Sequence, residues 1–100
     1  MNRLRLTEGA EADLEETIDW YFEEDPPSVD RFLAALEATY RAILESPTLY
    51  PQLHRGFRYR IVDRHPVSVI YHILDEIIEV VAVAHAKRRP GYWRRRNRNP

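Results

Sequence analysis

The first half of the chain holds two stretches in which apolar residues recur every three or four positions. The first begins after Thr7, a residue suited to cap a helix, and ends before Pro26 and Pro27. The second follows within a few residues and ends at Ser46. We therefore expect two helices in an antiparallel hairpin. Their apolar positions are Ala10, Leu14, Ile18, Tyr21 and Phe22, then Val29, Phe32, Leu33, Leu36, Tyr40, Ile43 and Leu44.

The second half of the chain changes to the alternating pattern of β-strands. Residues 57–62, 67–74 and 77–85 are rich in β-branched and aromatic side chains, and short turns separate them. Residues 3–6 form a further short strand before the first helix, and residues 47–56 form a loop. The pattern predicts an α+β fold of order β-α-α-β-β-β, with the helical hairpin on one face of an antiparallel sheet.

Alternation along the strands predicts which side chains share a face of the sheet. We expect one set to pack under the helices: Phe57, Tyr59, Ile61, Val67, Val69, Tyr71, Ile73, Ile78, Val80, Ala82 and Ala84. The other face would then be open and would carry Arg58, Arg60, Ser68, Ile70, His72, Glu79, Val81, Val83 and His85.

Composition limits the classes of protein that fit. The 100 residues are 44% hydrophobic, enough for one domain over residues 1–100, in which residues from about 90 onward form a flexible basic tail. Without cysteine there is no disulfide or thiolate metal site, and no two histidines lie at ligand spacing, so we expect no metal and no cofactor. We also expect no signal peptide, no membrane association and a cytoplasmic protein.

The net charge of −1 conceals an uneven distribution. Residues 1–50 hold 4 Arg against 12 acidic residues, whereas residues 51–100 hold 11 Lys or Arg against 4 acidic residues. Most of the acidic charge fits the solvated side of the helical hairpin. The basic half either binds an acidic or nucleic-acid partner or neutralises the first half within one fold.

Three interpretations of the predicted basic surface remain open. Histidine, tyrosine and arginine suit ribonuclease chemistry, which needs an acid, a base and a cation beside the phosphate. The same surface could bind phosphates or an acidic peptide, or its arginines and histidines could be structural. His54 and His65 lie in loops and receive no role. The residues that would bind a target or partner are Arg58, Arg60, His72, Lys87, Arg88, Arg89, Tyr92 and Trp93.

Several short motifs, taken in order, resemble the RelE/ParE superfamily of toxins from type II toxin–antitoxin modules. They span nearly the whole chain. They are Ala12-Asp13-Leu14-Glu15, Arg31-Phe32, Leu44-Glu45-Ser46-Pro47, Tyr50-Pro51, Phe57-Arg58, Val69-Ile70-Tyr71 and the run from Val80 to Arg88. The resemblance implies a toxin held inactive by a cognate antitoxin in a hetero-oligomer.

The resemblance implies one of two activities. RelE-like members cut messenger RNA on the ribosome, and the matching catalytic set here is Arg60, His85, Arg88 and Tyr92, with Arg58 in place of Arg60 or Glu45 as a base. ParE-like members inhibit DNA gyrase and have no such nuclease set. The acidic hairpin and residues 83–89 resemble the ParE-like branch more closely, which makes gyrase inhibition the favoured expectation. A toxin fold kept only as a binding module is the third possibility.

Overall fold

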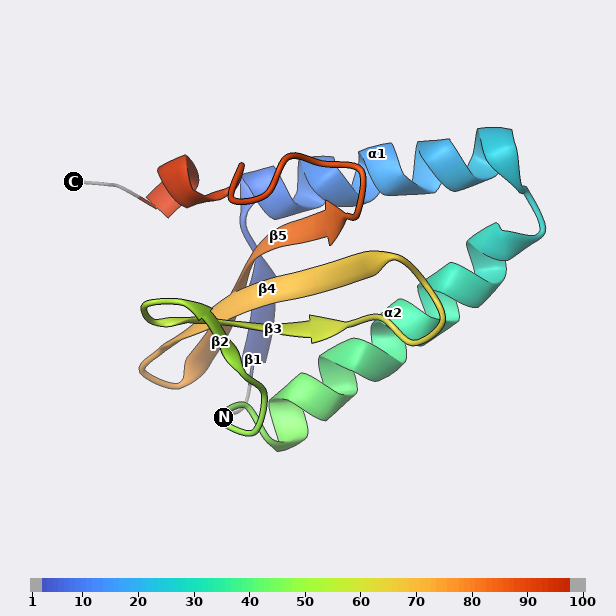
Figure 1. Ribbon diagram of the computed structural model, residues 1–100. Helices are drawn as coiled ribbons and strands as arrows, with labels where there is room; N and C mark the ends of the chain where they lie inside the picture. Colours follow the sequence, from blue (N-terminus) through green and yellow to red (C-terminus); the bar gives the residue numbers. More distant parts are fainter. Residues whose placement is uncertain (1–2, 98–100) are drawn as a thin grey trace.

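The computed structural model describes residues 3–97. Within them the chain forms five strands, two α-helices and a short 3₁₀ helix (Figure 1). The α+β arrangement is the predicted one, with an additional short strand in the segment expected to be a loop. In chain order the elements are β1 (Arg3–Leu6), α1 (Glu8–Glu24), α2 (Ser28–Glu45), β2 (Gln52–His54), β3 (Phe57–Ile61), β4 (Val67–Leu74), β5 (Ile77–His85) and η1 (Arg94–Asn97).

The ends of the helices follow from local hydrogen bonding. The Thr7 hydroxyl accepts a hydrogen bond from the Ala10 N–H at 3.1 Å, so α1 begins with the predicted cap. At its other end the Asp25 N–H donates to the Tyr21 carbonyl at 2.7 Å, and the two prolines follow. No side chain caps the N-terminus of α2, where Pro27 occupies the cap position. The Ser28 hydroxyl donates to the Asp25 carboxylate instead, which fixes the turn between the helices.

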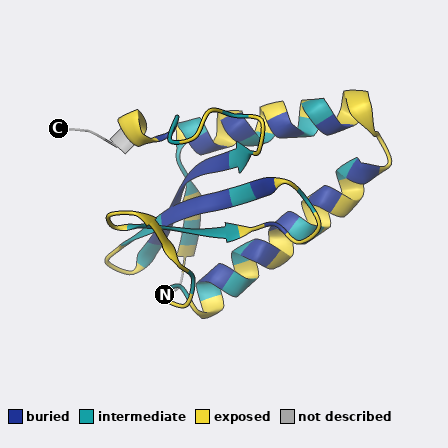
Figure 2. Cartoon of the chain, viewed as in Figure 1, coloured by how far each residue is buried: buried dark blue, intermediate teal, exposed yellow. Residues whose placement is uncertain are grey.

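The strands form one sheet in the order β1-β5-β4-β3-β2. β1 runs parallel to β5, and the other neighbouring strands are antiparallel. Both helices cover one face of this sheet, and they diverge from the turn that joins them (Figure 1). Phe32, Ile43, Tyr71 and Ile78 are fully buried in the core between the helices and the sheet. Burial is therefore concentrated on β4, β5 and the inner sides of the helices (Figure 2).

A β-bulge in β5 reverses the predicted alternation in its second half. Tyr71 pairs with Val80 and Ile70 pairs with Ala82, so Val81 has no partner on β4. Ile78 and Val80 pack under the helices as expected. Beyond the bulge Val83 packs under the helices, whereas Ala82 and Ala84, which were predicted there, lie on the opposite face. His85 consequently lies against Trp20 of α1, with ring centroids 4.7 Å apart, and not on the open face.

The predicted faces of β3 are also exchanged. Arg58 and Arg60 lie opposite Tyr71 and Val69, which belong to the core under the helices. Phe57 and Tyr59 instead pack on the other face, in a second apolar cluster with Ile70, Val81, Ala82 and Trp93. The prediction was wrong here because it assumed one buried face, whereas both faces of this sheet are partly covered.

The segment after β5 covers the second face. It folds back beside α1 (Figure 1), and Trp93 is only 2% exposed, packed against Phe57 at a centroid distance of 5.1 Å. The sequence predicts a flexible tail from about residue 90, yet residues 90–97 are held by this buried indole and by the contacts of Arg96 described below. Residues 98–100 lie outside the described part of the chain.

Candidate functional site

A buried carboxylate in α1 is the centre of the polar contacts that hold the C-terminal segment. Asp13 is 2% exposed and lies in the helix stripe that also contains the buried residues Ala10, Thr17 and Tyr21. β1 pairs with β5 only as far as Leu6 opposite Val80, so the edge of β5 beyond that point lacks a strand neighbour. The Asp13 carboxylate accepts a hydrogen bond from the Val83 N–H at 3.1 Å, and so satisfies a backbone donor that would otherwise be buried and unpaired.

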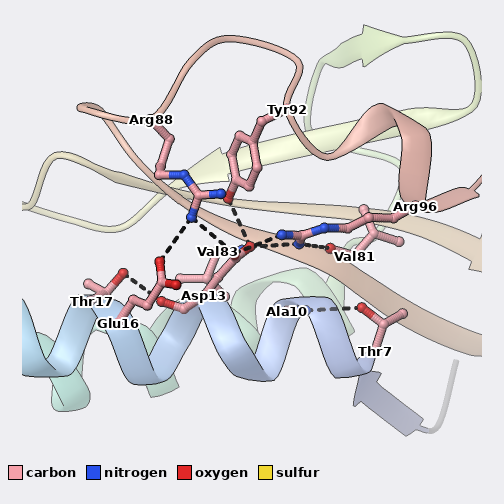
Figure 3. Close-up of polar contacts among 10 residues, drawn as sticks. All are labelled: Thr7, Ala10, Asp13, Glu16, Thr17, Val81, Val83, Arg88, Tyr92 and Arg96. Atoms are coloured by element: carbon pink, nitrogen blue, oxygen red, sulfur yellow. Dashed lines mark hydrogen bonds and ion pairs between the residues drawn. The ribbon is translucent and has the colours of Figure 1, made fainter.

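Three side chains of the C-terminal segment converge on this carboxylate (Figure 3). The Tyr92 hydroxyl donates to Oδ2 at 2.8 Å, and the Arg96 guanidinium donates to both oxygens, at 2.9 and 3.0 Å. Arg88 lies 3.4 Å from Oδ1 and 3.1 Å from the Glu16 carboxylate. Arg96 also donates to the Val81 carbonyl at 3.2 Å, beside the bulge. The network therefore joins α1, β5 and the C-terminal segment.

Glycine at position 9 is needed for Arg96 to reach Asp13. A Cβ atom at Gly9 would lie 2.9 Å from three atoms of the Arg96 side chain, closer than carbon atoms normally approach. The guanidinium therefore runs over the bare backbone of the first turn of α1. A side chain at position 9 would require the Arg96 guanidinium to shift from this position.

The network perturbs the ionisation of its members in a consistent direction. Hydrogen bonding to Asp13 raises the pKa of Arg96 above its ordinary value. Burial, followed by the hydrogen bond to the Asp13 carboxylate, raises the pKa of Tyr92 well above its ordinary value. The Arg88 guanidinium lies 3.8 Å from the centroid of the Tyr92 ring, and that of Arg96 lies 5.0 Å away on the same ring. At neutral pH Tyr92 is a neutral hydroxyl committed to donating.

A groove of about 370 Å³ lies between the C-terminal segment and the second face of the sheet. Leu53, Tyr59, Ile70 and Ala84 contribute apolar surface, and residues 88–94 form one wall. Its charged lining comes from Arg88, Arg89 and Arg94, and no Asp or Glu of the described residues lines it. The groove therefore combines apolar surface with excess positive charge, which suits a ligand that carries both apolar and acidic groups.

His85 lies at the end of this groove, with one ring nitrogen lacking a partner. The Lys87 N–H donates to Nδ1 at 3.1 Å, so the neutral ring carries its proton on Nε2. Nε2 is buried and has no hydrogen-bond partner among the described residues. Burial, and then the charge of Lys87, lower the pKa of His85. The lowered pKa favours the neutral ring, whose buried Nε2–H is unpaired among the described residues.

Arg58 and Arg60 lie on the helix side of the sheet and away from the groove. Arg58 donates to the Tyr50 carbonyl at 2.6 Å, and the Arg60 guanidinium lies 4.7 Å from the centroid of the Tyr50 ring. The Tyr71 hydroxyl donates to the Pro47 carbonyl at 2.6 Å on the same side, and burial raises its pKa to about 12. These contacts hold the loop after α2 against the sheet.

His72 lies on the second face of the sheet, as predicted, but it is engaged there. Its Nε2 lies 2.8 Å from the carboxylate of Glu79, which also accepts from Arg5 at 3.0 Å, and its ring stacks on Phe57 at 4.8 Å. Burial raises the pKa of Glu79, but the hydrogen bonds from His72 and Arg5 outweigh burial and leave that pKa lowered.

The structure thus brings only part of the predicted site together. Arg88, Arg89, Tyr92, Trp93 and His85 line one groove, and Lys87 lies 5.2 Å from the Trp20 ring nearby. Arg58, Arg60 and His72 lie elsewhere. Sequence reasoning missed Asp13, although an acidic residue at helical spacing between the apolar positions Ala10 and Tyr21 was a visible signal.

Other kinds of site find no support in the part of the chain that is described. Among residues 3–97 no group of three or more His, Asp or Glu side chains could hold a metal ion. None of the helices described there combines the length and apolar character needed to cross a membrane.

Comparison with known proteins gives a consistent assignment. The family described as the ParE toxin of the type II toxin-antitoxin system parDE matches residues 4–90. Toxin ParE2 of Mycobacterium tuberculosis is 29% identical over 90 residues, which cover 89% of this chain and 86% of that protein.

Two solved structures share the fold. One, titled as the chromosomal ParDE TA system from P. aeruginosa, matches with a TM-score of 0.63 at 19% identity over 85% of this chain and 96% of that one. The YoeB dimer from Staphylococcus aureus matches with a TM-score of 0.52 at 12% identity, over 83% and 94% of the two chains. The family match over residues 4–90 shows that the chain belongs to the ParE family, the toxins of type II toxin–antitoxin systems.

Proposed function

We propose that this ParE-family toxin arrests bacterial growth by inhibiting DNA gyrase and that a cognate antitoxin neutralises it. The observation that supports the gyrase branch is the state of the four residues that a ribonuclease would need. His85, Arg88 and Tyr92 line one groove, but Arg60 lies apart from it, and Arg88 and Tyr92 are already engaged by carboxylates. Arg60 lies on the helix side of the sheet, over Tyr50. The Tyr92 hydroxyl donates a hydrogen bond to the Asp13 carboxylate, and the Arg88 guanidinium pairs with Asp13 and Glu16.

The protonation states also oppose a ribonuclease. A general acid and a general base need pKa values near the working pH. Tyr92 has its pKa raised by burial and by Asp13, and His85 has its pKa lowered by burial and by Lys87. Tyr92 is therefore poorly suited to give up its proton near pH 7, and the lowered pKa of His85 disfavours the protonated ring that a general acid needs. The C-terminal segment is therefore better suited to binding than to proton transfer.

The groove is the proposed contact surface for the antitoxin. Its apolar lining and its three arginines suit an extended segment with alternating apolar and acidic residues. A toxin–antitoxin hetero-oligomer assembled in this way would hold the toxin inactive in the cytoplasm, where gyrase is found. The solved relative described as a ParDE system supports an antitoxin as the partner.

Two assays of the purified chain test the proposal. Added to DNA gyrase, it should abolish supercoiling or stabilise double-strand breaks, and premixing with the product of the neighbouring antitoxin gene should restore supercoiling. Added to ribosomes programmed with messenger RNA, it should leave the message intact. Codon-phased cuts together with unaffected supercoiling would overturn the gyrase assignment. Normal growth on induction, with folded protein present, would instead favour a binding module without toxicity.

One observation favours the alternative, a RelE-like endoribonuclease. His85 is among the residues that line the groove, close in sequence to Arg88, and its buried Nε2–H has no partner among the described residues, so a small rotation of the ring would be needed for it to donate to a phosphate. Under that alternative His85→Ala abolishes cutting while the fold is kept. Under the proposed function the same substitution leaves gyrase inhibition within a few-fold of wild type.

A further inference from the structure

The arginines of the C-terminal segment fall into two sets. Arg88 and Arg96 point inward and pair with the Asp13 carboxylate (Figure 3). Arg89, Arg94 and Arg95 are exposed, and none of them forms an ion pair with another described residue. The inward pair lies at the two ends of residues 88–96 and flanks the three exposed arginines, so a defined conformation of the backbone is needed to separate the two sets.

Trp93 alone does not define that conformation. The buried indole fixes one point of the segment, about which the flanking residues could still rotate. Arg88 and Tyr92 bind Asp13 from the side before Trp93, and Arg96 binds it from the side after. Contacts on both sides of the anchor remove this rotation and set which arginines face the groove.

Asp13 depends on the segment in return. Its carboxylate is 2% exposed, and the described residues supply it with one backbone N–H, from Val83, besides the three side chains of the segment. A buried carboxylate without cationic partners is strongly unfavourable. Release of the segment would leave such a charge behind, so the charge of Asp13 favours the docked conformation.

We propose that Asp13 is a positioning residue for partner binding. It holds Arg88 and Arg96 inward and thereby presents Arg89, Arg94 and Arg95 as the cationic surface beside the groove. We expect these three arginines to bind an anionic region of the toxin's target, and this part of the inference rests on the proposed function. The docking of the segment by Asp13 is a separate claim about the free chain.

Asp13→Asn tests both parts, because an amide keeps the size of the side chain and removes its charge. Hydrogen exchange of the full-length protein, read by mass spectrometry, should show exchange at least tenfold faster in residues 88–96, with β4 and β5 unchanged. Surviving colonies after induction should rise at least tenfold over wild type. Glu15→Gln is the matched control, because Glu15 is an exposed acid of the same helix that forms no ion pair with another described residue, and it should match wild type in both measurements.

A second pair of variants covers the case in which Asp13→Asn does not fold. Arg96→Gln should release the segment, and Arg96→Lys should restore part of the toxicity because an ammonium can still pair with Asp13. A merely structural role predicts that Arg89→Gln lowers toxicity equally in the wild-type and released backgrounds. Positioning predicts that Arg89→Gln has little further effect once the segment is released.

The outcomes separate the two proposals. Unchanged exchange in the folded Asp13→Asn and Arg96→Gln variants overturns the docking by Asp13. Faster exchange with full toxicity overturns the positioning role. A wild-type chain that arrests no growth overturns the proposed function, and the exchange measurement still decides whether Asp13 docks the segment.

Discussion

At the scale of single residues, Trp93 changes most between sequence and structure. In the sequence it is an aromatic residue in a basic tail, which is typical of an anchor exposed to a partner. In the structure it is 2% exposed and completes an apolar cluster with Ile70, Val81 and Ala82. We therefore expect Trp93 to act on binding indirectly, through the groove wall that it holds in place.

Replacing Trp93 with alanine should cost stability as well as function. Removal of a large buried aromatic side chain typically destabilises a protein by about 3–5 kcal/mol. We expect Trp93→Ala to lower the free energy of unfolding by about that amount, measured by urea unfolding followed by circular dichroism. Leu49→Ala is the control, because Leu49 is 70% exposed and its loss should change stability by less than about 0.5 kcal/mol. A Trp93→Ala protein as stable as the control would contradict the buried placement.

Two histidines should make stability depend on pH. Burial and the nearby charge of Arg31 lower the pKa of His65, and the opposing effect of Asp63 is smaller. Burial and the charge of Lys87 lower the pKa of His85. The folded chain therefore binds fewer protons than the unfolded chain, and its stability falls as the pH drops below the unfolded histidine pKa of about 6.5. Urea unfolding at pH 7.5 and pH 5.5 measures this loss. His65→Asn and His85→Asn should each make it smaller, and an unchanged loss in both variants would contradict the assignment.

At the scale of elements, the sequence predicts those features that depend on periodicity. The helical stripes, the Thr7 cap and the three main strands were predicted because each leaves a regular local pattern. The bulge at Val81 could not be predicted, because residues 80–84 are apolar at every position and fit either face. Phe57 and Tyr59 were misplaced for a related reason: only the long-range packing of Trp93 makes the second face of β3 apolar. The role of Asp13 could not be predicted for the same reason, since the partners of its carboxylate lie 70 or more residues away.

The N-terminal cap of α1 offers a test at this scale. The Thr7 hydroxyl accepts a hydrogen bond from the Ala10 N–H, and the loss of such a cap costs about 1 kcal/mol. Thr7→Ala should lower the free energy of unfolding by that amount, whereas Thr7→Ser should restore most of it. Thermal unfolding followed by circular dichroism makes the comparison. Equal midpoints for the alanine and serine variants would show that the cap does not support the helix.

At the scale of the whole molecule, the opposite charges of the two halves have separate places. Exposed acids such as Glu11, Glu15 and Glu23 lie on the outer side of α1. Arg88, Arg89 and Arg94 place positive charge at the groove on the other side of the sheet, whereas Arg58 and Arg60 lie on the helix side. Asp13 belongs to the acidic half but is buried under the C-terminal segment of the basic half, where it joins the two. The near-zero net charge therefore conceals an acidic outer side of α1, a basic groove and a buried connection between the two halves.

This separation predicts different results when charge is reversed on the two faces. Arg89→Glu combined with Arg94→Glu places negative charge beside the groove, where an acidic segment of the antitoxin should bind. We expect the dissociation constant of the toxin–antitoxin complex, measured by calorimetry, to rise at least tenfold, and its dependence on salt to weaken. Glu15→Lys combined with Glu23→Lys makes a charge change of equal size on the outer side of α1 and should alter the affinity less than threefold. Equal losses from the two double variants would mean that net charge alone, and not the groove, governs the association.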